Sequence, residues 1–278
     1  MSFSVSDHFL IPVADGHAVG EGWTADTEFR PRAVTWHWTA TRSLHECSRL
    51  LGGPNALRKG LASAHYGVGR SYQEGIHRYV ALDNRSWHAG KNQTVRWDGE
   101  ACRSAADKGH RTAIGIETVN VGYARAGFPA DSDWSRADSP HGRWQMRIQP
   151  WTEAQIHMMI ALGREIVARW PHIGPRDHHG HHDLCPDYKV DPVGFPFTRV
   201  LRGIYDDADL PDVWTPYWTA RQRRAALVEL GYGLGPGGRW DDDCDRALRD
   251  LQAAEGLLVN GRWSTFVSWR VHRLLGSR

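Results

Sequence analysis

The sequence has little charge imbalance, few cysteines and no long apolar run. The formal net charge of its 278 residues is only +2, which is too small to predict binding to nucleic acid. Four cysteines are scattered along the chain, so we expect reduced thiols and not a disulfide framework. No apolar run is long enough to span a bilayer, which argues against insertion into a membrane.

The first residues also lack the marks of a secretory signal. Residues 1–19 (MSFSVSDHFLIPVADGHAV) have neither a basic start nor an uninterrupted apolar core, so we expect synthesis in the cytoplasm without a signal peptide. The length is sufficient for one medium-sized domain and a smaller one. Tryptophan is unusually frequent, with 14 residues, and each can fill a core or offer a flat platform to a sugar ring.

The stretch with the richest chemistry is residues 180–192 (GHHDLCPDYKVDP). It combines imidazole, carboxylate, thiol and ammonium groups without a helical period, which predicts an ordered loop. Imidazoles and carboxylates are good ligands for zinc, and a catalytic zinc takes three protein ligands and leaves one position for water. This loop can supply two ligands, so a third must come from elsewhere. Alternatively, the histidine-rich run is a polar turn that binds metal adventitiously.

Three further segments have the alternating pattern of strands. Residues 33–39 (AVTWHWT) place His37 on one face and the tryptophans on the other. Residues 64–68 are a second predicted strand, and residues 113–120 are a third with Glu117 opposite its isoleucines. A lone histidine on a strand is more often structural than a metal ligand, and an edge ion pair is the simplest interpretation of Glu117.

The clearest predicted helix is residues 152–170. It begins with the capping-box pattern TEAQ and continues with apolar residues at helical spacing until Pro171. An apolar stripe on this helix should pack on the sheet. The preceding residues 122–149 are rich in Asp, Ser, Pro and Gly, and their role is not readable from the sequence.

Four motifs together resemble the zinc-dependent N-acetylmuramoyl-L-alanine amidases, which share a fold with peptidoglycan recognition proteins. The resemblance implies an α/β fold, a mixed β-sheet flanked by helices. The motifs are WHWT at residues 36–39, WHAG at residues 87–90, IGIE at residues 114–117, and the loop that opens with Gly180-His181 and closes with Lys189-Val190-Asp191-Pro192.

The resemblance also implies a ligand set. Carried over to this chain, His37, His181 and Asp191 would hold a zinc ion (Zn2+). Cys185 falls where the family has no ligand, and we do not count it. The extra histidines of the loop make other ligand choices possible.

The remaining motif residues would act on the substrate. Glu117 would be the general base, which requires hydrogen-bond reach of the attacking water. Lys189 would stabilise the transition state. Trp87 and His88 would lie on the substrate side of the cleft, although a buried Trp-His pair in a packing role is an equal alternative.

The last part of the chain changes character. We expect a catalytic domain over residues 1–205, a linker over residues 206–218, and a small three-helix module over residues 219–278. The tripeptide GRW occurs twice in this module, 23 residues apart, which suggests two related turn-helix units. The module resembles the peptidoglycan-binding module attached to many wall hydrolases, and a helical dimerisation cap is the alternative.

The implied reaction is hydrolysis of the amide bond between N-acetylmuramic acid and L-alanine in bacterial peptidoglycan. The expected setting is a phage or prophage endolysin, made in the cytoplasm and acting on the cell wall after release. One alternative is a peptidoglycan-binding protein of the same fold without catalysis. Another is a recycling amidase for soluble muropeptides, although such an enzyme would need no wall anchor.

Overall fold

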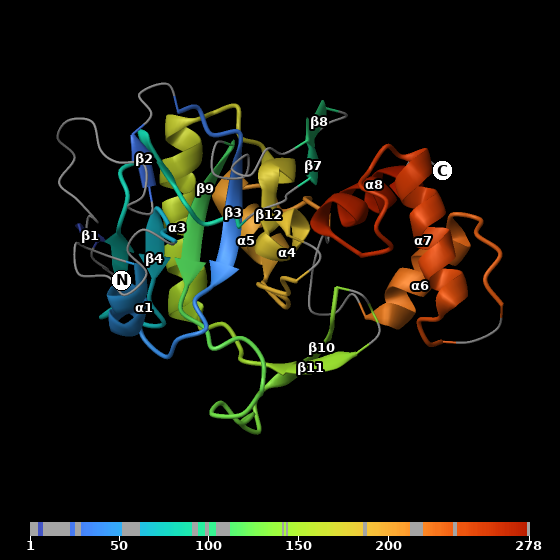
Figure 1. Cartoon of the computed structure of the whole chain (residues 1–278), viewed down its shortest axis with the longest axis horizontal. Coiled ribbons are helices and arrows are strands. Elements are labelled where there is room, and N and C mark those ends of the chain that lie inside the picture. The colour runs from blue at the N-terminus through green and yellow to red at the C-terminus, as the bar shows by residue number, and fades with distance from the viewer. Residues whose placement is uncertain are drawn as a thin grey trace.

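The centre of the computed structural model is a six-stranded mixed sheet, with strand order β1-β5-β4-β9-β3-β12 (Figure 1). Strands β4, β9, β3 and β12 are parallel, and β5 is antiparallel to β4. The strands are β1 (Val5–Asp7), β3 (Ala33–Trp38), β4 (Tyr66–Val68), β5 (Ile76–Arg78), β9 (Ala113–Thr118) and β12 (His178–Gly180). The structure describes residues 5–7, 23–25, 29–51, 62–90, 94–97, 100–103, 112–140, 142, 144–185, 188–211, 219–235 and 238–276.

In the described part of the chain, three small two-stranded sheets lie outside this central sheet. They pair β2 (Trp23–Ala25) with β6 (Asn84–Ser86), β7 (Thr94–Trp97) with β8 (Glu100–Arg103), and β10 (Ser135–Asp138) with β11 (Gln145–Ile148). The last pair gives the described part of residues 122–149 two antiparallel strands. Figure 1 shows this hairpin beyond the carboxyl ends of β3 and β9, between the central sheet and the C-terminal helices.

One face of the sheet is covered by α3 (Glu153–Arg169) and α5 (Phe197–Tyr205). The side chain of Thr152 accepts a hydrogen bond from the Gln155 amide, and the side-chain oxygen of Gln155 accepts one from the Thr152 amide, so the predicted capping box forms. Buried residues of α3, such as Met159 and Ile166, share one core with Trp36 and Ile116 of the sheet. Burying one apolar side chain of this size contributes about 1.5–3 kcal/mol.

The opposite face carries α1 (Leu44–Leu51) and the short α4 (His181–Leu184). Residues of α1 form a second buried cluster with Tyr79. The phenol of Tyr79 lies so close to Gly67 of β4 that a Cβ there would sit 2.3 Å from Oη. Glycine at this position therefore allows the aromatic ring to lie against the face that carries Glu117, because Gly67 and Glu117 are register partners.

The described C-terminal residues form three helices, α6 (Ala220–Glu229), α7 (Asp242–Ala254) and α8 (Thr265–Gly276). The predicted mixed sheet flanked by helices and followed by a helical C-terminal region is confirmed. Leu227, Trp263 and Val267 belong to the same buried cluster as Trp36 of the sheet, so the apolar core continues from one part into the other. Residues 212–218 of the predicted linker lie outside the described residues, and the division into domains remains a prediction.

The structure also bears on the cysteines and on the apolarity of the helices. Cys47, Cys185 and Cys244 are free thiols in the part of the chain that the structure describes. Within the same residues, we find no helix with the length and apolarity that crossing a bilayer requires.

Candidate metal centre and active site

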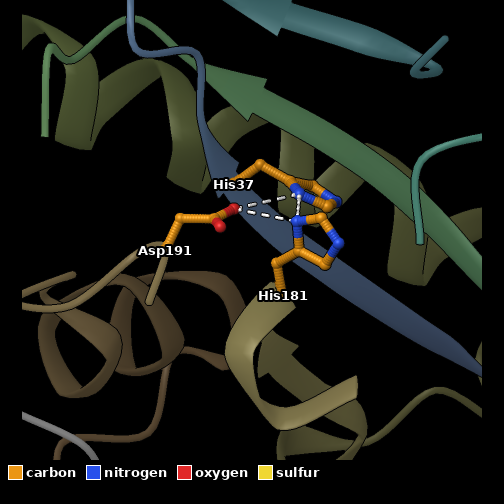
Figure 2. A group of neighbouring side chains, drawn as sticks. All are labelled: His37, His181 and Asp191. Carbon is orange, nitrogen blue, oxygen red and sulfur yellow. Dashed lines mark hydrogen bonds and ion pairs between the residues drawn. The ribbon is translucent and has the colours of Figure 1, made fainter. Parts of the chain in front are cut away.

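Sheet pairing brings the two ends of the sequence motif together. Strand β12 runs parallel to β3 with Gly180 opposite Trp36, so His181, the next residue, emerges beside His37. The loop then folds back, because the amide of His182 donates to the carbonyl of Asp191 at 2.9 Å. His37 of β3 and the two ends of this loop therefore meet at one point, as Figure 2 shows.

The side chains of His37, His181 and Asp191 form a compact triangle of potential ligand atoms. The two Nδ1 atoms are 3.0 Å apart, and Asp191 Oδ2 lies 3.0 Å from His181 Nδ1 and 3.3 Å from His37 Nδ1. Zinc bonds of about 2.0–2.1 Å in a tetrahedron would separate the ligand atoms by about 3.3–3.4 Å. The donor set therefore fits a metal ion such as zinc in both chemistry and spacing.

The protonation states of the ligands suit this interpretation. Burial, together with the nearby His181, lowers the pKa of His37 to about 3, so its imidazole is neutral at neutral pH. Burial alone would raise the pKa of Asp191, but the imidazoles of His181 and His37 outweigh it and hold the pKa well below the usual value. A neutral imidazole and an ionised carboxylate are the forms that bind a cation.

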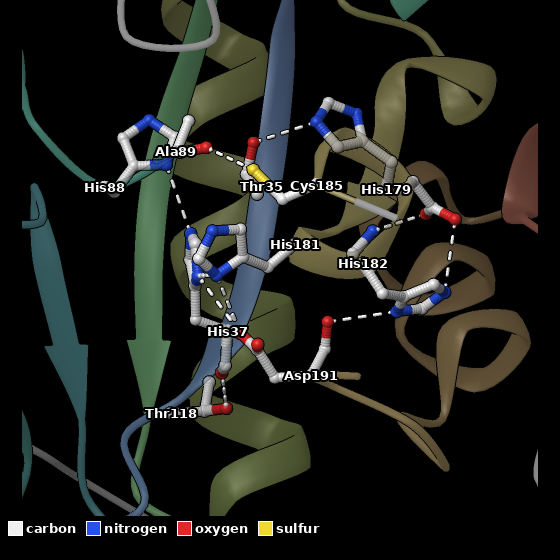
Figure 3. Close-up of polar contacts among 12 residues, drawn as sticks. Thr35, His37, His88, Ala89, Thr118, His179, His181, His182, Cys185 and Asp191 are labelled. Atoms are coloured by element: carbon white, nitrogen blue, oxygen red, sulfur yellow. Dashed lines mark hydrogen bonds and ion pairs between the residues drawn. The ribbon is translucent and has the colours of Figure 1, made fainter. Parts of the chain in front are cut away.

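His88 lies behind His37 and fixes the orientation of its ring (Figure 3). Its Nε2 is 3.1 Å from the carbonyl of Ala113, an acceptor, so Nε2 carries the proton. Its Nδ1 is therefore an acceptor for His37 Nε2–H at 3.1 Å. These two hydrogen bonds leave the lone pair of His37 Nδ1 directed at Asp191 and His181. The contacts of His88, which is buried, favour a role through His37 over direct contact with substrate.

Gly115 makes room for His88. A Cβ on Gly115 would lie 2.3 Å from Cγ of His88, so the imidazole packs directly on the backbone of β9. The glycine of the IGIE motif therefore has a steric reason that the sequence alone does not reveal. Trp87 is half-buried, and its amide donates a hydrogen bond to Ser63 Oγ at 2.9 Å.

Glu117 and Lys189 flank the triangle without belonging to it. Glu117 is the register partner of His37 on the adjacent parallel strand, which places both side chains on the same face of the sheet. Lys189 precedes Asp191 by two residues and is half-buried. Burial and the nearby His181 are the main causes of the lowered pKa of His37, and the positive charge of Lys189 adds to them.

The structure differs from the predicted loop at its start, where His181–Leu184 form one helical turn. The reason is the carboxylate of Asp183, which accepts a hydrogen bond from the Gly180 amide at 2.8 Å and caps the turn. Cys185 does not point at the ligand triangle but donates to the carbonyl of Ala89 at 2.8 Å, consistent with leaving it out of the ligand set.

The other histidines of the loop make separate contacts. His179 Nε2 lies 2.8 Å from Thr35 Oγ1. Nδ1 of His182 lies 3.0 Å from the carbonyl of Asp191 and Nε2 lies 3.1 Å from Asp183 Oδ1. Burial would lower the pKa of His182, but the Asp183 carboxylate outweighs it and raises the value. Sequence reasoning missed Asp183 and His182, and only the histidine-rich run hinted at them.

These features are accompanied by a clear family assignment. The family model of N-acetylmuramoyl-L-alanine amidases matches residues 27–194, which is more than half of the chain. The protein belongs to this family of peptidoglycan amidases.

Individual relatives agree with the assignment. The chain is 28% identical over 173 residues to the N-acetylmuramoyl-L-alanine amidase AmiD of Escherichia coli K12, a match covering 58% of this chain and 52% of AmiD. It thus spans about half the length of that relative. The structure of AmiD from E. coli with the substrate anhydro-N-acetylmuramic acid-L-Ala-D-gamma-Glu-L-Lys has a similar fold, with 22% identity, a TM-score of 0.51 and 89% of each chain covered.

Proposed function

We propose that the protein hydrolyses the amide bond between N-acetylmuramic acid and L-alanine of the peptidoglycan stem peptide. The observation that carries the proposal is the buried triangle of His37, His181 and Asp191 in a chain of the amidase family. All three positions of the implied ligand set are present, which disfavours the alternative of a binding protein without catalysis.

In this proposal, His37, His181 and Asp191 hold a zinc ion. A zinc ion in such a site lowers the pKa of a water molecule and polarises the carbonyl group that is attacked. Glu117, on the same face as His37, would take the proton from the attacking water and pass it to the leaving amine. The ammonium of Lys189 would stabilise the negative charge that develops on the carbonyl oxygen.

The test is digestion of purified peptidoglycan followed by mass spectrometry of the products. We expect N-acetylmuramic acid residues that carry a free lactyl carboxylate, and stem peptides with a new L-alanine amino terminus. A chelator should abolish the reaction and zinc should restore it. The variant Asp191→Ala should be inactive at any zinc concentration. Products cut within the glycan or within the stem peptide would contradict the proposed bond specificity.

We further propose that the wall itself is the substrate, as for an endolysin that acts after release from the cell that makes it. The repeated GRW units and the three C-terminal helices support a wall anchor, since linking a binding unit raises the local concentration on a polymer. A recycling role on soluble fragments is a second candidate, because the structure of AmiD is a complex with the substrate anhydro-N-acetylmuramic acid-L-Ala-D-gamma-Glu-L-Lys.

Rates on intact sacculi and on a soluble anhydromuropeptide distinguish these two settings. An endolysin-type enzyme should sediment with sacculi and degrade them efficiently. In the producing cell, the enzyme alone should leave the wall intact, whereas opening the cytoplasmic membrane should cause lysis. Turnover of the soluble fragment with no binding to sacculi would favour the recycling role.

A further inference from the structure

The carboxylate of Asp183 connects the C-terminal helices to the loop of the candidate metal site. It is buried and accepts hydrogen bonds on both oxygens. Oδ2 accepts from the Gly180 amide at 2.8 Å and from the Thr265 hydroxyl at 2.6 Å. Oδ1 accepts from the Thr265 amide at 3.1 Å and pairs with His182 Nε2 at 3.1 Å. A buried carboxylate is costly unless it is bonded in this way, and Thr265 supplies half of these contacts.

Asp183 also stabilises α8, because Thr265 is the first residue of that helix. The first amides of a helix have no acceptor within the helix, and Asp183 provides one across 82 positions of sequence. The next residue, Phe266, packs against the cluster of Leu184 and Cys185, and its ring centroid lies 5.6 Å from that of His179. The start of α8 is thus seated directly on the loop.

Asp183 in turn contacts the segments that carry two of the three ligands. Its bond to the Gly180 amide fixes the backbone immediately before His181. Its partner His182 bonds the carbonyl of Asp191 with Nδ1 at 3.0 Å and with its own amide at 2.9 Å. Figure 3 shows His182 reaching Asp191 on the side of the loop away from His37.

We infer that α8 is a structural part of the metal centre, with Thr265 as a positioning residue that holds His181 and Asp191 in place through Asp183 and His182. The inference rests on the proposed zinc site and adds a role for the C-terminal helices beyond binding the wall. A module that served only as an anchor would have no influence on the affinity for metal.

The test compares two single substitutions of α8 in the full-length protein. Thr265→Val keeps the shape of the side chain but removes the hydroxyl donor to Asp183. Ser268→Ala is the matched control, because Ser268 is an equally buried hydroxyl of the same helix that bonds Trp263 Nε1 at 2.9 Å and does not contact the loop carboxylate. Thr265→Ser should restore the hydroxyl and rescue the defect.

The measurement is the zinc dissociation constant, from competition with a chromophoric chelator, together with the melting temperature without zinc. We expect Thr265→Val to bind zinc about 10-fold to 100-fold more weakly, the usual effect of removing a supporting partner of a metal ligand. Ser268→Ala should lower the melting temperature and leave zinc affinity unchanged. Should Thr265→Val not fold, Thr265→Ala takes its place in the same comparison.

Two results would overturn the inference alone: parental zinc affinity in Thr265→Val, or an equal loss of affinity in Ser268→Ala, which would indicate a general loss of stability. If the parental protein bound no zinc, or if Asp191→Ala bound it equally well, the proposed metal site would fail and the inference with it. The parental titration therefore separates the two failures.

Discussion

Replacement of His88 by phenylalanine should weaken zinc binding without touching a ligand. His88 Nδ1 is the acceptor for His37 Nε2–H at 3.1 Å, and phenylalanine has a similar shape but no acceptor. His37 is buried, so its N–H would lose its partner, and the ring would no longer be held with the Nδ1 lone pair directed at the site.

Two independent estimates give the size of this effect. A buried donor left without a partner costs about 1–3 kcal/mol. Loss of a residue that supports a metal-bound histidine typically weakens metal binding about 10-fold to 100-fold, which corresponds to about 1.4–2.8 kcal/mol. The estimates overlap, so a change of about 10-fold or more in the zinc dissociation constant is expected.

The assay is competition with a chelator of known affinity, with activity measured at saturating zinc as a second readout. His88→Asn provides a graded comparison, because its amide oxygen lies near the position of Nδ1 and keeps an acceptor for His37. It should bind zinc more tightly than His88→Phe. Trp87→Phe is the neighbouring control and should change KM for the substrate with zinc affinity unchanged. Parental zinc affinity in folded His88→Phe would refute the proposed orientation of His37.

Three other substitutions test the remaining parts of the site. Glu117→Gln should retain zinc but reduce turnover about 10²–10⁴-fold, because an amide cannot accept the proton; metal analysis and turnover on the same samples check this, and a parental rate would remove Glu117 from the mechanism. Lys189→Met should lower kcat about 10²–10³-fold by loss of oxyanion stabilisation, whereas a merely structural lysine would change the melting temperature and leave kcat unaltered. Gly115→Ala should displace His88 and weaken zinc binding about 10-fold to 100-fold, measured by the same competition, because a Cβ there would lie 2.3 Å from the imidazole. Gly233→Ala, where a Cβ meets nothing within 4 Å, is the control for the glycine substitution.

Local sequence patterns were sufficient to predict the parts of the fold that depend on local physics. Alternation in residues 33–39 predicted β3, and the capping box at Thr152 predicted the start of α3, as the structure has them. Resemblance to a family predicts the candidate ligands, and the structure places potential ligand atoms of His37, His181 and Asp191 within 4.8 Å of one another.

The supporting contacts could not be predicted, because their partners are distant in sequence. His88 and His37 are 51 positions apart, and Asp183 and Thr265 are 82 apart. Neither pair has a local pattern, since each depends on how the loop, the sheet and α8 pack. The helical turn at His181 was missed for a similar reason, as the sequence gives no period over a helix of four residues.

The register of the central sheet explains why the candidate site lies where it does. His37 and Glu117 each occupy the fifth of six positions in β3 and β9, close to the carboxyl ends of parallel strands, where sites in such sheets commonly lie. Side chains alternate between faces, so a slip of one residue would exchange His37 for a tryptophan on the ligand face. The apolar face, with Trp36 and Ile116 fully buried under α3, makes such a slip costly. The hydrophobic core thereby fixes which residue of each strand faces the candidate metal site. The geometry of the ligands therefore depends on the packing of apolar residues on the opposite face of the sheet.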